Sequence, residues 1–134
     1  MIRGIAHLAF NVMDMEKSLH FYCDILSFKK VFEINDDRNR PWIVYIQVSD
    51  NQYLELFYTR NEEIQSRPVV GYSHLCLEVD DIYTIAKIME ENDVHLDVLP
   101  MQGKDKNYQC WVQDPDGNKI EFMQMVPHAP ELKS

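Results

Sequence analysis

The sequence lacks any uninterrupted run of 18 apolar residues, the length that a membrane-spanning helix requires. It also lacks a block of basic residues, and its formal net charge at pH 7 is −9. A chain with this charge repels a phosphate backbone, so nucleic acid is not an expected partner. The composition therefore favours neither a membrane protein nor a nucleic-acid-binding protein.

Cysteine is scarce, with only Cys23, Cys76 and Cys110 in the chain. Their odd number, wide spacing and apolar surroundings are typical of reduced core residues rather than of a disulfide framework. The first residues enter a strand-like pattern directly, with no charged leader followed by an apolar signal segment. We therefore expect a cytoplasmic protein.

The order of predicted elements occurs twice along the 134 residues, of which 46% are hydrophobic. The repeats cover about residues 1–60 and 71–126, joined by a polar linker. Strands are predicted at 5–12, 27–33, 42–48 and 52–58 in the first repeat, and at 72–79, 95–99, 108–113 and 119–126 in the second. Helices are predicted at 14–26, where Asp14 is the expected N-cap, and at 81–92. The sequence thus predicts one α+β domain, residues 1–134, made of two βαβββ modules.

Two proline-containing sites are expected to shape the second repeat. Pro100 is expected to end the short strand at 95–99. The Asp114-Pro115-Asp116-Gly117 segment predicts a tight hairpin turn, because proline presets φ and glycine permits a positive φ.

Histidine and glutamate recur at matched spacing in the two repeats. His74 lies 67 residues after His7 (74 − 7), and Glu121 lies 66 residues after Glu55 (121 − 55). Side chains alternate between the two faces of a strand, and one face of each strand is more uniformly apolar. That apolar face should pack beneath the helix, and all four residues fall on the opposite face. We therefore expect the two pairs to converge.

This set of side chains predicts a metal site. Burying a carboxylate is costly unless it is paired or bound to a metal. Imidazole and carboxylate together suit Zn, Ni, Co, Fe or Mn better than Ca or Mg, and a set without cysteine is expected to leave positions open for water or substrate. Taken singly, Glu55 and Glu121 could instead face solvent or pair with lysine, but the joint pattern favours a metal held by His7, Glu55, His74 and Glu121.

Five segments carry a resemblance to a known family and together span nearly the whole chain. They are I-A-H-L-A-F-N-V, S-L-H-F-Y-C-D-I-L-S-F, Y-L-E-L-F, G-Y-S-H-L-C-L-E-V-D-D and D-P-D-G-N-K-I-E-F. The pattern resembles the vicinal oxygen chelate superfamily, which includes glyoxalase I, methylmalonyl-CoA epimerase, extradiol dioxygenases and fosfomycin- and bleomycin-resistance proteins. The resemblance implies that the two βαβββ modules form a half-open β-barrel around the metal.

Glyoxalase I is the most similar member in length and ligand set. The resemblance implies a lyase or isomerase for methylglyoxal detoxification, which converts a 2-oxoaldehyde–thiol hemithioacetal to a 2-hydroxyacyl thioester through an enediolate. It implies one divalent metal per site (Zn or Ni, possibly Co) on His7, Glu55, His74 and Glu121. Glu121 is the first choice for the catalytic base, with Glu55 as its counterpart. A homodimer with ligands from both subunits is also implied.

Two departures concern the thiol co-substrate. Bacterial glyoxalase I usually has an arginine four residues after the first metal histidine and an asparagine four residues after the first glutamate, both serving glutathione. Asn11 and Thr59 stand at these places. The co-substrate therefore stays open between glutathione and another thiol. Lys104 and Lys106 could supply anion contacts, although a solvated loop is the simpler interpretation.

Other functions are compatible with the pattern. An acyl-CoA epimerase of the methylmalonyl-CoA type uses the same four ligands. Extradiol dioxygenases and fosfomycin-type thiol transferases need only two histidines and one glutamate, and are disfavoured. A non-catalytic drug-binding resistance protein needs no metal, so metal content separates it from the enzymes. Several further side chains either line a substrate pocket or fill the sheets: Trp42, Tyr45, Phe57, Met123 and Met125.

Overall fold

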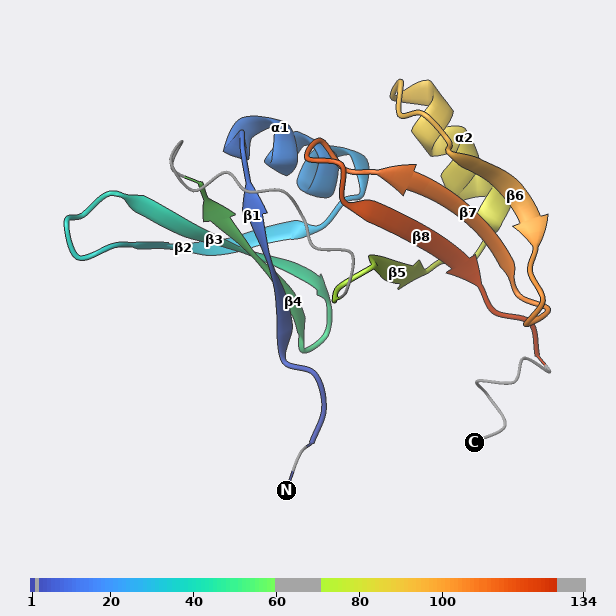
Figure 1. Cartoon of the computed structure of the whole chain (residues 1–134), viewed down its shortest axis with the longest axis horizontal. Helices are drawn as coiled ribbons and strands as arrows, with labels where there is room; N and C mark the ends of the chain where they lie inside the picture. Colours follow the sequence, from blue (N-terminus) through green and yellow to red (C-terminus); the bar gives the residue numbers. More distant parts are fainter. Residues whose placement is uncertain (2, 60–70, 128–134) are drawn as a thin grey trace. The chain divides into compact units, whose positions relative to one another are not determined.

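The computed structural model describes residues 1, 3–59 and 71–127, and the chain divides into two compact units, residues 1–68 and 69–134. Each unit contains one of the two predicted repeats, with a strand, a helical segment and three further strands (Figure 1). The α+β fold of two βαβββ modules is therefore confirmed. Apart from Gly71, the predicted linker between the repeats lies outside the described residues.

The first unit is a four-stranded sheet with one helical segment. Its elements are β1 (His7–Val12), α1 (Met15–Leu19), the π-helix η1 (His20–Ile25), β2 (Lys29–Asn35), β3 (Pro41–Ser49) and β4 (Gln52–Tyr58). The strand order is β1-β4-β3-β2, in which β1 and β4 are parallel and the other neighbours are antiparallel. The parallel pairing is what brings the first strand of the unit next to its last.

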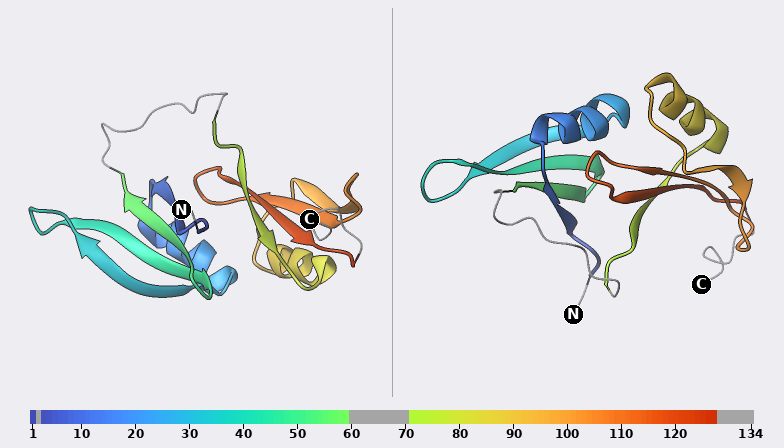
Figure 2. Two further views of the ribbon diagram at one scale, coloured as in Figure 1. Left: turned by 90° about the horizontal axis from the view of Figure 1, so that it is seen from below. Right: turned by 45° about the horizontal axis from the view of Figure 1, so that its top comes forward.

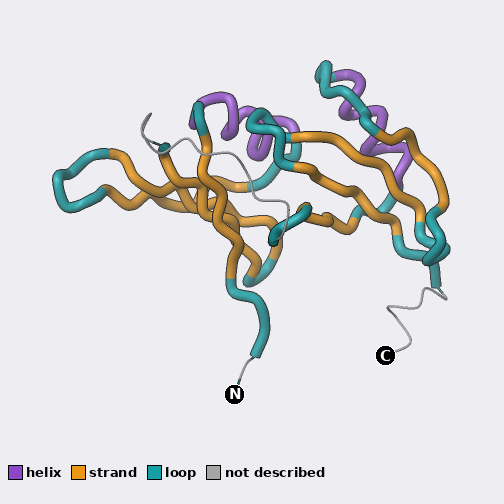
Figure 3. The backbone as a smooth tube through the Cα atoms, in the orientation of Figure 1, coloured by secondary structure: helices purple, strands orange, loops and turns teal. Residues whose placement is uncertain are grey.

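The helical segment of the first unit covers one face of its sheet (Figure 3). Phe10 of β1 stacks on Tyr22 of η1, so the apolar face of β1 packs beneath the helix, as the alternation pattern predicts. Val12, Val44, Ile46 and Leu56 are also almost fully buried. Residues of the other parity therefore lie on the face that the helix leaves uncovered.

The predicted helix at 14–26 begins where the sequence indicates but changes character midway. Asp14 is the N-cap, and its carboxylate accepts a hydrogen bond from the backbone N–H of Lys17 at 3.1 Å. From His20 onward the turns widen to a π-helix, in which the N–H of Leu26 donates to the carbonyl of Phe21, five residues earlier, at 3.0 Å. The expectation of one uniform helix is therefore wrong after residue 19.

The second unit repeats this arrangement. Its elements are β5 (His74–Glu78), α2 (Ile82–Glu91), β6 (Val98–Gln102), β7 (Tyr108–Gln113) and β8 (Lys119–Gln124), with the strand order β5-β8-β7-β6. Here β5 and β8 are parallel. Asp81 caps α2 by accepting hydrogen bonds from the N–H groups of Tyr83 and Thr84 at 2.9 and 3.0 Å. Ile82, Ala86 and Met89 form the buried stripe of the helix; in Figure 2 the helix lies along one face of this sheet.

Strand β6 is placed three residues later than the sequence predicts. Residues 95–97 precede it, and Pro100 lies inside the strand rather than at its end. Because β6 is an edge strand and its register shifts between Val98 and Met101, the missing N–H of proline costs it no ladder hydrogen bond. The expectation that Pro100 terminates the strand is wrong for this reason.

The turn between β7 and β8 is built around the buried carboxylate of Asp114. It accepts hydrogen bonds from the N–H of Asp116, the N–H of Asn118 and the side-chain amide of Asn118 at 2.9, 2.8 and 2.7 Å. Gly117 adopts a φ of 80°, a conformation that glycine tolerates. The predicted structural role of this segment is confirmed.

The cysteines differ in burial. All three lie in the described part of the chain, and none is in a disulfide. Cys110 is fully buried and Cys23 is half-buried, whereas Cys76 is exposed. The expectation of a core position is therefore wrong for Cys76, because this residue lies on the face of β5 that α2 does not cover.

No helix within the described residues is both long and apolar enough to cross a membrane.

Candidate metal centre

His7 and Glu55 are in direct contact in the first unit. His7 begins β1 and Glu55 lies in the middle of β4, on the face of the sheet away from the helix. Nε2 of His7 contacts Oε2 of Glu55. The Glu55 side chain is only 7% exposed, whereas that of His7 is 43% exposed. The contact therefore satisfies a buried carboxylate while leaving the imidazole accessible.

His74 and Glu121 form the corresponding pair in the second unit. Nε2 of His74 lies 3.2 Å from Oε1 of Glu121, and Nδ1 of His74 lies 3.0 Å from the hydroxyl of Ser73. Glu121 is again the more buried partner. Both ring nitrogens of His74 thus have a neighbour, and a contact at Nδ1 is the kind that sets which tautomer presents Nε2.

An aromatic residue flanks the pair in the first unit. Tyr45 of β3 is the direct cross-strand neighbour of Glu55, so the two side chains share a face. The pKa of Tyr45 is raised because its hydroxyl donates a hydrogen bond to the Glu55 carboxylate, with burial adding to the shift. The Tyr45 ring also meets the His7 ring edge-on, with the ring centroids 6.4 Å apart.

The second unit places an indole where the first places the phenol. Trp111 of β7 is the direct cross-strand neighbour of Glu121, and its ring lies 4.6 Å from the His74 ring, centroid to centroid. Its Nε1–H donates to Oε1 of Gln109 at 2.7 Å. Trp111 follows Tyr45 by 66 residues (111 − 45), the same offset as that of the glutamates. Trp111 is the flanking residue that the sequence patterns left out, and this offset is the signal that identifies it.

The structure thus brings the four predicted ligands together as two pairs, one within each unit. Within residues 1, 3–59 and 71–127, no three His, Cys, Asp or Glu side chains gather as a metal-binding group. Each unit by itself is half of a four-ligand set, and a site that uses all four remains a prediction.

The residues at the glutathione-associated places can also be located. Asn11 pairs with Phe57 across β1 and β4, on the same face as His7. Thr59 directly follows β4, and its N–H donates to the carbonyl of Val12 at 3.2 Å. Lys104 and Lys106 are exposed, on a turn that a hydrogen bond from Gly103 N–H to Asn107 O closes at 2.8 Å. This favours a solvated loop for the two lysines.

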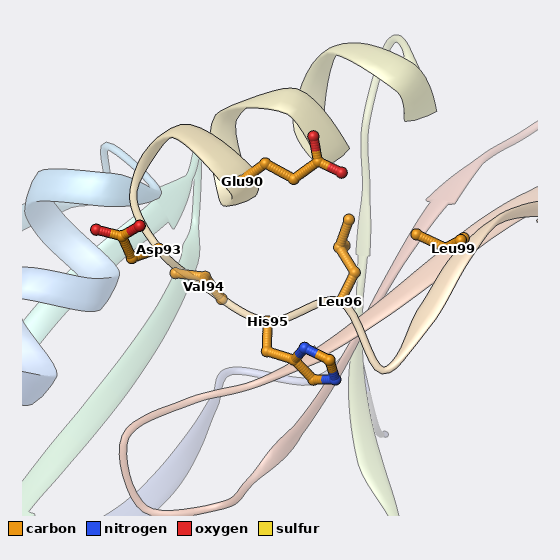
Figure 4. Close-up of a pocket in the computed structure, with 6 residues that line it drawn as sticks. All are labelled: Glu90, Asp93, Val94, His95, Leu96 and Leu99. Carbon is orange, nitrogen blue, oxygen red and sulfur yellow. The ribbon is translucent and has the colours of Figure 1, made fainter.

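A hollow of about 430 Å³ lies at the end of α2 and the start of β6, lined by Glu90, Asp93, Val94, His95, Leu96 and Leu99. In Figure 4 the carboxylates of Glu90 and Asp93 and the ring of His95 point in different directions. His95 instead lies 3.7 Å from Asp97. The lining includes none of the four candidate ligands, so this hollow does not compete with the paired site.

Comparison with known proteins assigns the family. The model of the glyoxalase/bleomycin resistance protein/dioxygenase superfamily matches residues 4–122. The probable lactoylglutathione lyase of Synechocystis sp. is 32% identical, over 90% of this chain and 94% of that protein. The lactoylglutathione lyase of Neisseria meningitidis serogroup A is 31% identical, over 90% of this chain and 89% of that protein.

A solved structure shows the same fold. It is a member of this superfamily from Sphaerobacter thermophilus, with a TM-score of 0.75 and 26% identity, covering 92% of this chain and 98% of that one. Together with the named relatives, it supports a glyoxalase-type function.

Proposed function

Because the chain belongs to the glyoxalase/bleomycin resistance protein/dioxygenase superfamily, we propose that it is a metal-dependent enzyme of the glyoxalase I type. The proposed reaction isomerises the hemithioacetal of a 2-oxoaldehyde and a thiol to a 2-hydroxyacyl thioester. The observation that carries the proposal is the contact between a histidine Nε2 and a glutamate carboxylate in each unit, at repeat-related positions and on the face that the helix leaves uncovered.

The donor set fits a divalent transition metal. We propose that His7, Glu55, His74 and Glu121 hold one such cation, which is Zn or Ni, with Co as a third candidate. Two neutral imidazoles and two carboxylates match the ligand preferences of these metals, and the two carboxylates balance the charge of a divalent ion. When bound, the cation supplies electrostatic stabilisation of the negative charge that develops on the substrate oxygens.

The protein's own carboxylates supply the proton transfer. In the isomerisation, a proton leaves the carbon that bears the sulfur and one is delivered to the neighbouring carbon, so no oxidant or reductant is needed. We assign this transfer to Glu121, with Glu55 as its counterpart in the first unit. Both are buried side chains, which keeps bulk water from competing for the proton.

The thiol is glutathione or another low-molecular-weight thiol. Asn11 and Thr59 cannot form the ionic contacts that an arginine at the first of these places would make with a glutathione carboxylate. The aromatic and apolar side chains on the ligand face, Tyr45 and Phe57 among them, favour a substrate with a smaller charge.

We further propose a homodimer whose sites draw ligands from both subunits. Two half-sets per chain make one complete set per chain, whether the halves come from one subunit or from two. The cytoplasm is the proposed location, which the three thiols outside any disulfide support.

Turnover tests this function directly. Apo protein is reconstituted separately with Ni, Co and Zn and assayed with the methylglyoxal–glutathione hemithioacetal. Metal-dependent formation of lactoylglutathione is the expected result. Stoichiometric metal binding without turnover with any thiol would instead favour the acyl-CoA epimerase, and absence of both would favour a drug-binding protein.

A further inference from the structure

The two glutamates occupy repeat-related positions but have different neighbours. Tyr45 lies directly opposite Glu55 in the first sheet, and Trp111 lies directly opposite Glu121 in the second. The phenol hydroxyl of Tyr45 donates to Glu55. The only donor of the Trp111 side chain, Nε1–H, is directed to Gln109 at 2.7 Å. A side chain on the middle strand therefore holds one glutamate and not the other.

The position of the Tyr45 ring is itself constrained. Phe32 of β2 stacks on it, with ring centroids 4.3 Å apart and an angle of 18° between the planes. The His7 ring meets another side of it at 6.4 Å. Because a tyrosine has only two side-chain dihedrals, contacts of this kind leave the hydroxyl little freedom to move away from Glu55.

We propose that Tyr45 is a positioning residue that orients the Glu55 carboxylate as a metal ligand, and that it thereby divides the labour between the two glutamates. The Tyr45 hydrogen bond occupies a lone pair of Glu55 that proton transfer would otherwise use, so Glu55 acts as the fixed ligand. Glu121 has no such donor on its middle strand and keeps its carboxylate available to move the proton. This inference rests on the proposed function.

Hydrogen bonds that orient a metal ligand typically contribute 10–100-fold to metal affinity. Removing the Tyr45 hydroxyl should therefore weaken metal binding by roughly this factor while leaving the ring packing in place. The effect should be specific for the coordination geometry, and Co(II) reports that geometry through its visible absorption spectrum.

The test compares three substitutions with the unmodified protein, using Co(II) alone as the probe. Tyr45→Phe removes the hydroxyl. Phe32→Leu keeps the hydroxyl but removes the stacking that holds it, and should weaken affinity in the same direction by less. Tyr58→Phe is the matched control, because it makes the same chemical change on the same strand as Glu55 but on the opposite face. Calorimetric titration gives affinity and stoichiometry, and thermal unfolding of each apo protein reports its stability.

The expected result is one Co(II) per chain for the unmodified protein, 10–100-fold weaker binding with an altered spectrum for Tyr45→Phe, and unchanged behaviour for Tyr58→Phe. Unchanged affinity and spectrum in Tyr45→Phe would overturn the positioning role and leave the proposed function intact. Equal losses in both tyrosine variants would overturn it too, since they indicate a general structural effect. A failure of the unmodified protein to bind Co(II) would instead overturn the proposed function.

Discussion

Tyr45 lies directly across the strand ladder from Glu55 and donates its hydroxyl hydrogen to that carboxylate. In the second sheet the same place is held by Trp111, whose N–H donates elsewhere. The repeat therefore preserves the ligand residues and the aromatic neighbour but not the hydrogen bond. A duplicated fold can in this way acquire two glutamates with different duties.

Replacing a predicted ligand should remove metal binding. We expect His7→Ala and His74→Ala each to weaken affinity for Ni or Co by more than about 100-fold, because losing a ligand costs more than losing a group that orients one. Metal analysis after dialysis and calorimetric titration measure this. His20→Ala is the control in the first unit, since His20 is exposed and pairs with Asp24 at 2.9 Å. Equal loss in this control would contradict the assignment.

The two glutamates should respond differently to removal of their charge. Glu121→Gln should lower kcat by about 10²–10⁴, the usual contribution of a general base, and Glu55→Gln should act mainly through lost metal. Assays at saturating metal separate the two effects. Recovery of kcat by added metal in Glu121→Gln, but not in Glu55→Gln, would reverse the assignment.

Mixing experiments address the source of the ligands. One variant carries His7→Ala with Glu55→Ala, and the other carries His74→Ala with Glu121→Ala. If each site combines halves from two subunits, co-refolding the two variants restores one intact site in every mixed dimer. Neither variant alone should bind metal. A mixture that is dimeric by light scattering but binds no metal would place all four ligands in one subunit.

Thiol labelling should follow burial. Cys76 is exposed, whereas burial raises the pKa of Cys110 to about 11. We expect iodoacetamide at pH 8 to modify Cys76 first and Cys110 only after unfolding. The pKa of Cys23 is also raised, by burial and then by the charge of Asp24, so this thiol should react at an intermediate rate. Mass spectrometry of timed samples measures the order, and early labelling of Cys110 would contradict it.

The same pKa shift has a consequence for stability at high pH. Burial raises the pKa of Cys110 in the folded state above its unfolded value, so the folded protein retains a proton that the unfolded chain releases. This contribution is complete below the unfolded pKa, near 9, and is lost as the pH rises through about 11. Urea unfolding between pH 8 and pH 11 should show a smaller decline in Cys110→Ala than in the unmodified protein. An identical decline would refute this.

The Asp114 carboxylate should be important for stability. Asp114→Ala removes the acceptor of three hydrogen bonds and should lower the free energy of unfolding by about 3 kcal/mol. Chemical denaturation with urea measures the change. Asp37→Ala, at an exposed loop position, should change it by less than about 0.5 kcal/mol. A small effect of Asp114→Ala would show that water replaces the carboxylate in this turn.

The sequence by itself determined the features that depend on local periodicity and on backbone chemistry. The order of elements, the Asp14 cap and the turn at Asp114 follow from residues close together in the chain. The faces of His7 and Glu55 follow from alternation, because successive side chains of a strand must point to opposite sides. These predictions needed no knowledge of which strands are neighbours.

Only the tertiary structure decided what depends on pairing between distant strands. The parallel alignment of β1 with β4 brings His7 against Glu55, and the antiparallel alignment of β3 with β4 places Tyr45 opposite the same carboxylate. The edge position of β6 makes Pro100 acceptable within a strand, and the uncovered face of β5 exposes Cys76. Register and edge position are set by packing between segments far apart in the chain, so no local pattern contains them.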